Sequence, residues 1–290
     1  MPHWRQLARL AYRDRLLRTR DLQGFLMMRL SPAWTALALF IAAAPAAAAD
    51  LASHRAAYRL SLDNARSSSD VQGADGAMYY EAMDQCDAWT ARQRFTLTVT
   101  SRSGTSYEMA SDYVTWEAKD GSRLRFRLRQ TTDGQVTQAI TGEARREPGG
   151  GTIRYTEPTE DEIDLPADAL FPMAHTSKVL DAAIAGRRVF AVPVFDGTTT
   201  EGAQDTNAAI TARIEPGTNG GDRWASLAAL PSFRMRIAFF EAGSNTGQPE
   251  YEVAMRYWTN GVADDLKMDF GEFVVDGRLT ELEMLPDQCN

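Results

Sequence analysis

The stretch RLRFRLRQTTDGQVTQAITGEA, residues 123–144, decides the fold. Its first part alternates arginine with leucine or phenylalanine, and this period of two is typical of a strand with one buried face. Asp133-Gly134 follows, a dipeptide that tolerates the positive φ angles of a tight hairpin turn. Residues 136–144 can then pair back on the first strand. The stretch therefore predicts an antiparallel hairpin.

Similar patterns extend this hairpin in both directions and predict a meander. The alternating segments are 58–62, 95–99, 107–116, 153–155, 189–195, 210–214, 233–240, 251–258, 266–275 and 279–285. Asp120-Gly121 and Asp276-Gly277 are predicted turns between neighbouring strands, and three glycines at 149–151 interrupt the central run. Most strands show one apolar face, which suits a sheet curled around an interior.

One segment has helical rather than strand periodicity. FPMAHTSKVLDAAIAG, residues 171–186, carries apolar residues at helical spacing and ends in Gly186, a typical helix stop. The acidic segment 157–168 contains Pro158 and Pro166 and is predicted to be a loop. No repeat or linker divides the chain, so residues 50–290 are expected to form one mainly β domain, a long antiparallel sheet with one or two short helices.

The N-terminus has the charged, apolar and small-residue order of a secretory signal peptide. SPAWTALALFIAAAPAAAA, residues 31–49, follows Arg29 and ends in small residues, so we expect cleavage after Ala49 and export to the periplasm. Residues 1–26 hold six arginines before Met27 and Met28, either of which suits an ordinary leader start. This segment is either untranslated sequence or a basic amphipathic extension that lies on a membrane surface.

The exported part is acidic. Removing residues 1–49 takes away seven Arg and two Asp, which leaves 24 basic and 37 acidic residues and a net charge of −13. General binding to phosphate backbones depends on Lys and Arg that displace counterions. Nucleic acid is therefore not an expected partner.

The chain has two cysteines, Cys86 and Cys289. In an oxidising compartment an even pair is most simply explained by one disulfide. Such a bond would close a loop of 203 positions, for which the chain-entropy model gives roughly 5 kcal/mol. The alternative is two free thiols or a metal-binding pair, although neither residue has a second ligand nearby in the sequence.

Catalytic and cofactor motifs are not found. His54 and His175 are isolated, so no metal site is expected, and a buried or capping role is favoured for both. No nucleophile elbow, phosphate loop or dinucleotide fingerprint is present, so neither enzymatic activity nor a cofactor is expected. Acidic residues cluster at Glu160, Asp161, Glu162 and Asp164, for which the alternatives are a solvated loop, a glycosidase carboxylate pair or a calcium site.

Arg123, Arg125, Arg127 and Arg129 are the most informative polar residues. Strand alternation places all four guanidinium groups on one face, at intervals of roughly 6.5 to 7 Å. Such a ladder could bind anionic lipid headgroups, the phosphates of an envelope glycolipid or an acidic protein. The alternative is pairing with carboxylates on neighbouring strands of the same domain.

Two strands of the final third have fully apolar faces. Their residues are Phe233, Met235, Ile237 and Phe239 on the first, and Tyr251, Val253, Met255 and Tyr257 on the second. These faces form either a packed core or the wall of an interior that holds an acyl chain.

Several stretches together resemble the EipB-type cell envelope integrity family of periplasmic proteins. They are HRAAYRLSL (54–62), MYYEAMDQCDAWTARQR (78–94), WEAKDG (116–121), LPADALFPMAHT (165–176) and the terminal Cys289. The resemblance implies a β-spiral, in which a long sheet curls into an open barrel-like bowl, and a disulfide between Cys86 and Cys289. It also implies a non-enzymatic role in envelope integrity.

The expected function is therefore to support the envelope by binding periplasmic or envelope proteins or components. The alternative is a carrier of lipid or lipoprotein that uses the apolar interior of the curved sheet. A weaker alternative, a glycan-directed enzyme, depends on the acidic cluster alone.

Overall fold

The computed structural model describes residues 49–218, 223–243 and 247–289, which belong to one compact unit. The elements in chain order are β1 (His54–Ala65), β2 (Val71–Asp84), β3 (Ala88–Ser101), β4 (Ser106–Ala118), β5 (Arg123–Thr132), β6 (Gln135–Glu147), β7 (Gly150–Glu157), β8 (Asp161–Asp164), α1 (Pro172–Ile184), β9 (Val189–Val194), β10 (Gln204–Ile214), β11 (Ser232–Phe240), β12 (Tyr251–Trp258), β13 (Ala263–Asp269) and β14 (Phe273–Met284). The predicted leader lies, up to residue 48, outside the described residues.

Fourteen strands form one antiparallel sheet from two meanders placed side by side. Spatial order follows chain order from β1 to β8 and again from β9 to β14. The two meanders meet where β14 pairs with β1, with His54 opposite Met284 at one end of the ladder and Ala65 opposite Phe273 at the other. β8 and β9 are the two edges of the sheet.

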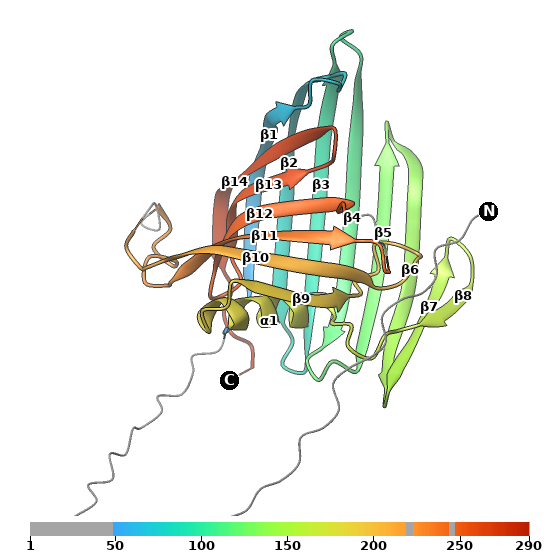
Figure 1. Cartoon of the computed structure of the whole chain (residues 1–290), viewed down its shortest axis with the longest axis vertical. Helices are drawn as coiled ribbons and strands as arrows, with labels where there is room; N and C mark the ends of the chain where they lie inside the picture. Colours follow the sequence, from blue (N-terminus) through green and yellow to red (C-terminus); the bar gives the residue numbers. More distant parts are fainter. Residues whose placement is uncertain (1–48, 219–222, 244–246, 290) are drawn as a thin grey trace, which may run out of the picture. The chain divides into compact units, whose positions relative to one another are not determined.

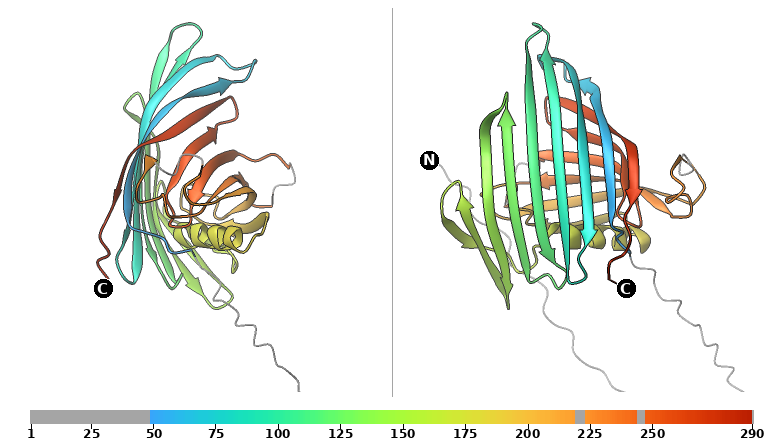
Figure 2. Two further views of the ribbon diagram at one scale, coloured as in Figure 1. Left: turned by 90° about the vertical axis from the view of Figure 1, so that its left-hand side faces the viewer. Right: turned by 180° about the vertical axis from the view of Figure 1, so that it is seen from behind.

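The sheet is rolled. The long strands β1–β7 make a curved wall, and β9–β13 curl over its concave side (Figures 1 and 2). Helix α1 connects the two edge strands, β8 and β9, and lies beside β9 (Figure 1). A parallel bridge joins Leu170, which lies between β8 and α1, to Val194 at the end of β9. The predicted curled antiparallel sheet with a helix is thus confirmed.

Two large apolar clusters occupy the inner side of the sheet. The larger one includes Leu60, Leu97, Phe233 and Trp258, and the inner side of α1 packs on it. The second fills the space between β5–β7, the segment that leads into α1 and the segment that follows β9. Its largest fully buried side chains are Leu124, Ile140, Ile153, Tyr155, Leu165, Phe171 and Phe195. None of the helices in the described residues has the length and apolar character needed to cross a bilayer.

The turn predicted at Asp276-Gly277 is wrong. The chain turns at Gly271, which has a φ of 85°, and Asp276 and Gly277 lie inside β14. A Cβ on Gly277 would approach the Leu266 side chain to 3.0 Å and the Leu60 side chain to 3.3 Å. The glycine is therefore explained by close packing over a central strand and not by a reversal.

The loop predicted over 157–168 is wrong for Asp161–Asp164, which form the edge strand β8. Pairing with β7 places Glu162 opposite Arg154, and the two side chains form an ion pair of 2.7 Å. Ile163 packs on the second apolar cluster. Edge strands commonly carry charges that discourage further pairing, which explains why an acidic segment forms one.

Strand β2 was not predicted, because glycine and alanine dilute its alternation. A Cβ on Gly76 would lie 2.0 Å from the carbonyl oxygen of Thr96, so the close approach of β2 and β3 needs a glycine there. The helix was predicted correctly: α1 begins at Pro172 and ends at Ile184, and Gly186 follows with a φ of 75°.

Gly197 carries the tightest constraint in the second cluster. It follows β9 with a φ of 77°, and a Cβ there would lie 2.3 Å from Cγ of Phe126. The Phe126 ring is itself held edge-on between Phe195 at 5.3 Å and Tyr155 at 5.8 Å. Neither the backbone nor the ring can move away without loss of packing.

We expect Gly197→Ala to destabilise the domain by about 3 kcal/mol, because it adds overpacking to an unfavourable backbone conformation. Gly104→Ala is the matched control: its φ is 87°, but no atom lies within 4 Å of the added Cβ. That control should cost only about 1 kcal/mol. Urea unfolding measures both, and equal losses in the two variants would show that Phe126 imposes no packing constraint.

Candidate binding cavity and outer face

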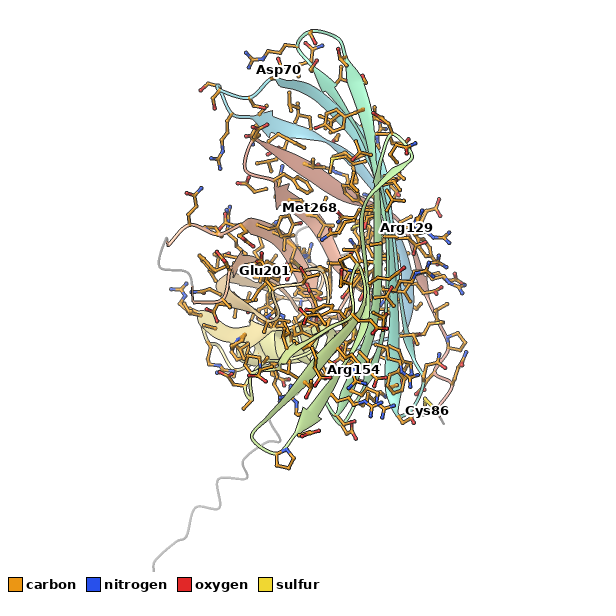
Figure 3. All side chains as sticks on the ribbon, turned by 90° about the vertical axis from the view of Figure 1, so that its right-hand side faces the viewer. Asp70, Cys86, Arg129, Arg154, Glu201 and Met268 are labelled. Carbon is orange, nitrogen blue, oxygen red and sulfur yellow. A yellow bond between two sulfur atoms is a disulfide. The ribbon has the colours of Figure 1, made fainter. Side chains whose placement is uncertain are left out.

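Side chains do not fill the whole interior of the rolled sheet. A cavity of about 600 Å³ lies between the wall strands and β12–β13, within the size range of sites for small apolar molecules. Figure 3 shows Met268, one of its lining residues, on the inner side of the sheet. The aromatic and methionine side chains that line it are Tyr58, Met78, Tyr80, Phe95, Met109, Tyr113, Met173, Phe239, Tyr251, Tyr257, Met268 and Phe270.

The predicted apolar strand faces are divided between core and cavity. Phe233, Met235 and Ile237 are buried in the larger cluster, whereas Phe239 lines the cavity. On β12, Met255 is buried, and Tyr251, Val253 and Tyr257 line the cavity. The two strand faces therefore contribute partly to the packed core and partly to the wall of the cavity.

The tyrosine hydroxyl groups of the cavity wall mostly bond to the protein. Tyr58 Oη donates to the carbonyl of Ala263 at 2.8 Å, Tyr113 Oη donates to the carbonyl of Asp196, and Tyr257 Oη donates to Thr176 Oγ1 at 3.3 Å. Burial raises the pKa of each of these phenols. The hydroxyls therefore stay neutral and serve as fixed donors, not as bases.

His54 lies at one end of the cavity and is 2% exposed. Its Nδ1 is 2.7 Å from the carbonyl oxygen of Ala52, and since a carbonyl only accepts, Nδ1 carries the hydrogen. Burial lowers the pKa of the imidazole, which favours the neutral form. Nε2 is then an acceptor, and no donor within the described residues reaches it. The second predicted buried histidine, His175, contacts Thr206 Oγ1 at 3.0 Å, as expected for a structural role.

Glu117 joins the wall to the helix. Its side chain is 2% exposed, and its two carboxylate oxygens accept hydrogen bonds from the first free amides of α1, Met173 N at 2.7 Å and Ala174 N at 2.8 Å. A carboxylate at a helix N-terminus satisfies amides that have no partner inside the helix. Burial nevertheless raises the pKa of Glu117 to about 7. Sequence reasoning missed this residue because a lone glutamate in a strand gives no such signal.

The predicted arginine ladder lies on the outer face of β5, away from the interior; Figure 3 shows Arg129 there. Arg125 pairs with Glu143 of β6 at 2.9 Å, and Arg123 lies 3.9 Å from the same carboxylate. Arg127 and Arg129 are exposed and form no ion pair with any described residue. The ladder therefore consists of a neutralised half and an unpaired half.

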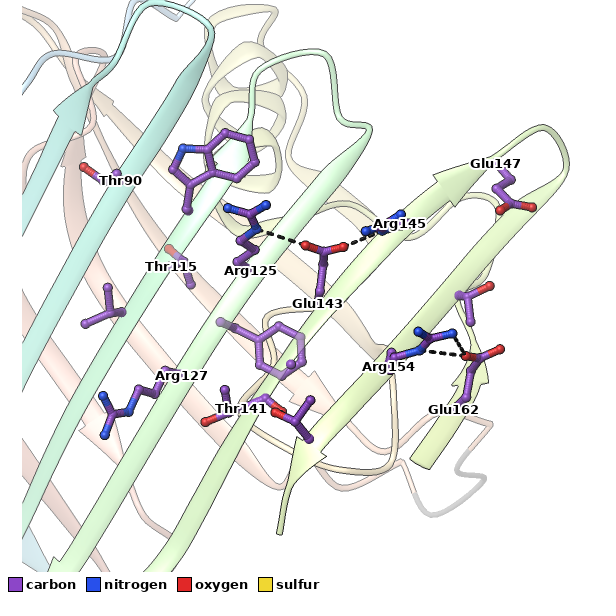
Figure 4. A pocket seen from close by; sticks show the side chains of 16 residues that line it. Thr90, Thr115, Arg125, Arg127, Thr141, Glu143, Arg145, Glu147, Arg154 and Glu162 are labelled. Carbon is purple, nitrogen blue, oxygen red and sulfur yellow. Dashed lines mark hydrogen bonds and ion pairs between the residues drawn. The ribbon is translucent and has the colours of Figure 1, made fainter. Parts of the chain in front are cut away.

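A groove of about 850 Å³ runs across this outer face from β3 to β8 (Figure 4). Trp116 and Val114 form its apolar side, and the guanidinium of Arg125 lies 5.3 Å from the Trp116 ring centre. Arg127 extends into the groove opposite Thr141 of β6, whereas Glu143 is engaged by Arg125 and Arg145 (Figure 4). The groove thus combines an aromatic side chain with both charges, since four arginines and three glutamates are among its lining residues.

The acidic cluster lies in and directly before the edge strand β8. Glu162 is bonded to Arg154, and Glu143, which lines the same groove, lies opposite Arg154 in the ladder between β6 and β7. In the described part of the chain, no three His, Cys, Asp or Glu side chains come together as metal ligands would. The observation on which the glycan-directed alternative depended is therefore explained by an edge strand.

Cys86 and Cys289 form a disulfide, with their Cα atoms 5.2 Å apart. Cys86 lies in the turn between β2 and β3, and Cys289 lies in the tail that follows β14. The last backbone hydrogen bond of the tail joins Leu285 N to the carbonyl of Ser53 at 2.9 Å. The bond therefore fastens the tail beside the seam between the two meanders.

The match to a family model decides the relationship of this chain to known proteins. The model described as EipB-like matches residues 45–286. The chain belongs to the EipB-like family. It is 27% identical over 251 residues to the cell envelope integrity protein EipB of Brucella abortus (strain 2308), with 84% of this chain and 88% of that protein covered.

A solved structure supports this assignment at the level of the fold. It is the crystal structure of a beta-barrel-like protein with a domain of unknown function, DUF1849, also from Brucella abortus. The TM-score is 0.76 at 25% sequence identity, and the alignment covers 82% of this chain and all of that one. The sequence resemblance to the EipB family is thus confirmed.

The stretches that carry the EipB-like resemblance converge in space. His54 and Tyr58 come from the first, Met78 and Tyr80 from the second, and Met173 from the segment that begins α1; all five line the cavity. Glu117, from WEAKDG, binds the start of α1 directly beside them. Residues from three of these stretches therefore line the cavity, and a fourth stretch contributes Glu117 beside it.

We expect Glu117→Gln to change the pH dependence of stability. Because the pKa is about 7 when folded and near 4.5 when unfolded, this group favours the folded state below pH 4.5, and that contribution is lost as the pH rises through 7. The difference in unfolding free energy between pH 5 and pH 8 should shrink by about 2 kcal/mol in the variant. Glu281→Gln, at an exposed site of β14, is the control, and an unchanged pH dependence in Glu117→Gln would contradict the assignment.

Replacing both cysteines, Cys86→Ser with Cys289→Ser, should lower the free energy of unfolding by about 2 to 5 kcal/mol, because the unfolded chain is released from a loop of 203 positions. Thermal unfolding with and without reductant measures this loss. Reductant should lower the melting temperature of the unaltered protein to that of the variant and leave the variant unchanged. Equal melting temperatures under oxidising conditions would rule out a stabilising bond.

Proposed function

We propose that this EipB-like protein is a non-enzymatic periplasmic protein that supports cell envelope integrity by binding envelope proteins or components. The family match and the printed name of the Brucella relative support the envelope role. A disulfide suits an oxidising compartment, and the leader pattern of residues 31–49 suits export. Together these observations favour the periplasm.

The unpaired half of the arginine ladder is the single observation that carries the binding proposal. Most other arginines of the outer face have carboxylate partners, as in the pairs of Arg92 with Asp112 and Arg154 with Glu162. Arg127 and Arg129 instead present two free guanidinium groups beside the groove. In a domain with a large excess of acidic residues, such a local cationic site favours an anionic partner: an acidic protein surface or the phosphates of an envelope glycolipid.

A carrier of lipid or lipoprotein is the second candidate function. The observation in its favour is the cavity of about 600 Å³ with its aromatic and methionine lining. An apolar cavity of this size exceeds what side-chain packing leaves in an ordinary core. The two candidates use opposite faces of the same sheet, so each can be tested without disturbing the other.

We expect the double variant Arg127→Gln with Arg129→Gln to lose the envelope function, because both unpaired cations are removed. Growth of a strain that lacks the gene, complemented with the variant and plated on detergent, should fall to the level of the empty strain. The purified variant should melt within about 2 °C of the unaltered protein, since exposed substitutions seldom change stability much.

Arg234→Gln with Arg236→Gln is the matched control. These arginines also alternate on an exposed strand face, but they pair with Asp265 at 3.0 Å and Glu252 at 2.8 Å. The control should restore detergent resistance fully. If the Arg127→Gln with Arg129→Gln variant also restored full detergent resistance, the outer face would not be the binding surface.

A further inference from the structure

We infer that the inner cavity selects a cationic amphiphile, a molecule with an apolar body and an ammonium group at its polar end. This inference deepens the carrier function proposed above and rests on it. It is carried by the charges of the cavity lining and by the aromatic side chains that lie beside its exposed carboxylate, Glu250.

The lining carries acidic side chains and no basic ones. No Lys or Arg is among the lining residues, all of which lie in the described part of the chain, and the acids there are Asp196 and Glu250. Burial lowers the pKa of the His54 imidazole, so the histidine of the lining favours its neutral form. An anionic headgroup inside the cavity would therefore lose its water without gaining a counter-charge. The charge of the lining favours a cation instead.

The carboxylate of Glu250 is accessible and lies on the inner side of the sheet. Its Oε2 accepts a hydrogen bond of 3.3 Å from Nε2 of Gln204, which also lines the cavity. Gln204 belongs to the same face of β10 as Thr206 and Ala208, which are buried inside the roll. Glu250 is exposed and forms no ion pair with any described residue. Because it is both exposed and part of the lining, it lies where the cavity meets solvent and can receive a cation there.

Aromatic side chains continue from Glu250 along the cavity. The amide of Glu250 donates to the carbonyl of Phe239 at 2.9 Å, and the ring of the next residue, Tyr251, lies 5.9 Å from that of Phe239 between centres. Phe270 follows at 5.7 Å from Tyr251, and Phe95 at 6.3 Å from Phe270. All four rings line the cavity, and Phe239, Tyr251 and Phe270 are only partly buried. Aromatic rings attract ammonium groups and also pack against hydrocarbon, so this row suits both parts of the ligand.

The cavity continues beyond these rings as an apolar space. Val253 is aligned with Met268 across β12 and β13, and both line the cavity. Met78 and Met109 contribute from the wall strands β2 and β4. Methionine side chains are flexible and adapt to apolar groups of different shapes. An elongated ligand can thus place its ammonium group beside Glu250 and its hydrocarbon among the methionines.

Three probes with the same decyl chain test the inference: decyltrimethylammonium, decyldimethylamine oxide and decanesulfonate, titrated below their micelle concentrations into the purified protein and followed by calorimetry. Their headgroups are similar in size, and their net charges at neutral pH are positive, zero and negative. We expect the ammonium probe to bind about fivefold more tightly than the amine oxide, and the sulfonate to bind most weakly.

Two carboxylate variants separate a local charge from the general acidity of the domain. Glu250→Gln should reduce the preference for ammonium over sulfonate by about threefold, because an exposed carboxylate contributes modestly. Glu252→Gln is the matched control: it removes the same charge two residues along the chain, where the carboxylate pairs with Arg236 at 2.8 Å on the outer face. This control should leave the preference unchanged.

Two variants of Tyr251 test the aromatic part of the site. Tyr251→Leu should weaken binding of the ammonium probe about threefold more than binding of the amine oxide, because the ring is lost. Tyr251→Phe keeps the ring and should keep the preference. Glu250→Gln changes an exposed side chain, so it remains informative if Tyr251→Leu lowers stability.

The outcomes are distinguishable. Equal or tighter binding of the sulfonate, or a preference for ammonium that Glu250→Gln leaves unchanged, would overturn the selection of a cation while leaving the carrier function intact. An equal loss of preference in Glu252→Gln would assign it to the acidity of the whole domain and would also overturn the site. Binding of none of the three probes would overturn the carrier function itself, and with it this inference.

Discussion

The antiparallel ladder between β1 and β14 is the constraint on which the rest of the structure depends. Each meander is built from local hairpins, but the two halves of the sheet are joined only where the start of the domain meets its end. Contacts between such distant segments carry the largest loop-closure cost in folding. The disulfide lies beside this seam and reduces that cost by restricting the unfolded chain. Closure of the seam in turn sets the width of the interior.

That width explains why a cavity exists. Barrels of about eight strands are just wide enough for their own side chains to fill, and a rolled sheet of fourteen encloses more. The chain reduces the space with α1 at one end and with the segment around Phe171 and Phe195 at another. Glu117 fixes the helix in that place through two amides. The cavity, which is lined by tyrosine, phenylalanine and methionine side chains, occupies the space that these two elements leave.

The period of two made the strands and the curled sheet predictable, and helical spacing did the same for α1, because burial of one face leaves a direct trace in the sequence. Three features left no such trace. Gly277 resembled a turn because Asp-Gly is a turn dipeptide, and only the packing of Leu60 and Leu266 shows its real role. The strand β8 was not predicted, because three of its four residues are acidic and give no apolar alternation. The environment of the buried His54 ring depends on the nearby carbonyl of Ala52 and on Tyr80, which reaches the ring only when β1 and β2 pair.

The same alternation separates two chemistries on one set of strands. Every outward arginine of β5 has an inward leucine or phenylalanine beside it, so adjacent residues of one strand build the cationic outer face and the apolar inner face. The chain holds three lysines among its 31 basic residues, so most of its cationic side chains are arginines. Guanidinium groups bind carboxylates and phosphates in a fixed bidentate geometry, which an ammonium group does not. The cavity and the outward arginines therefore lie on opposite faces of the same sheet, with β4 and β5 contributing to the cavity lining and β5 carrying the arginines.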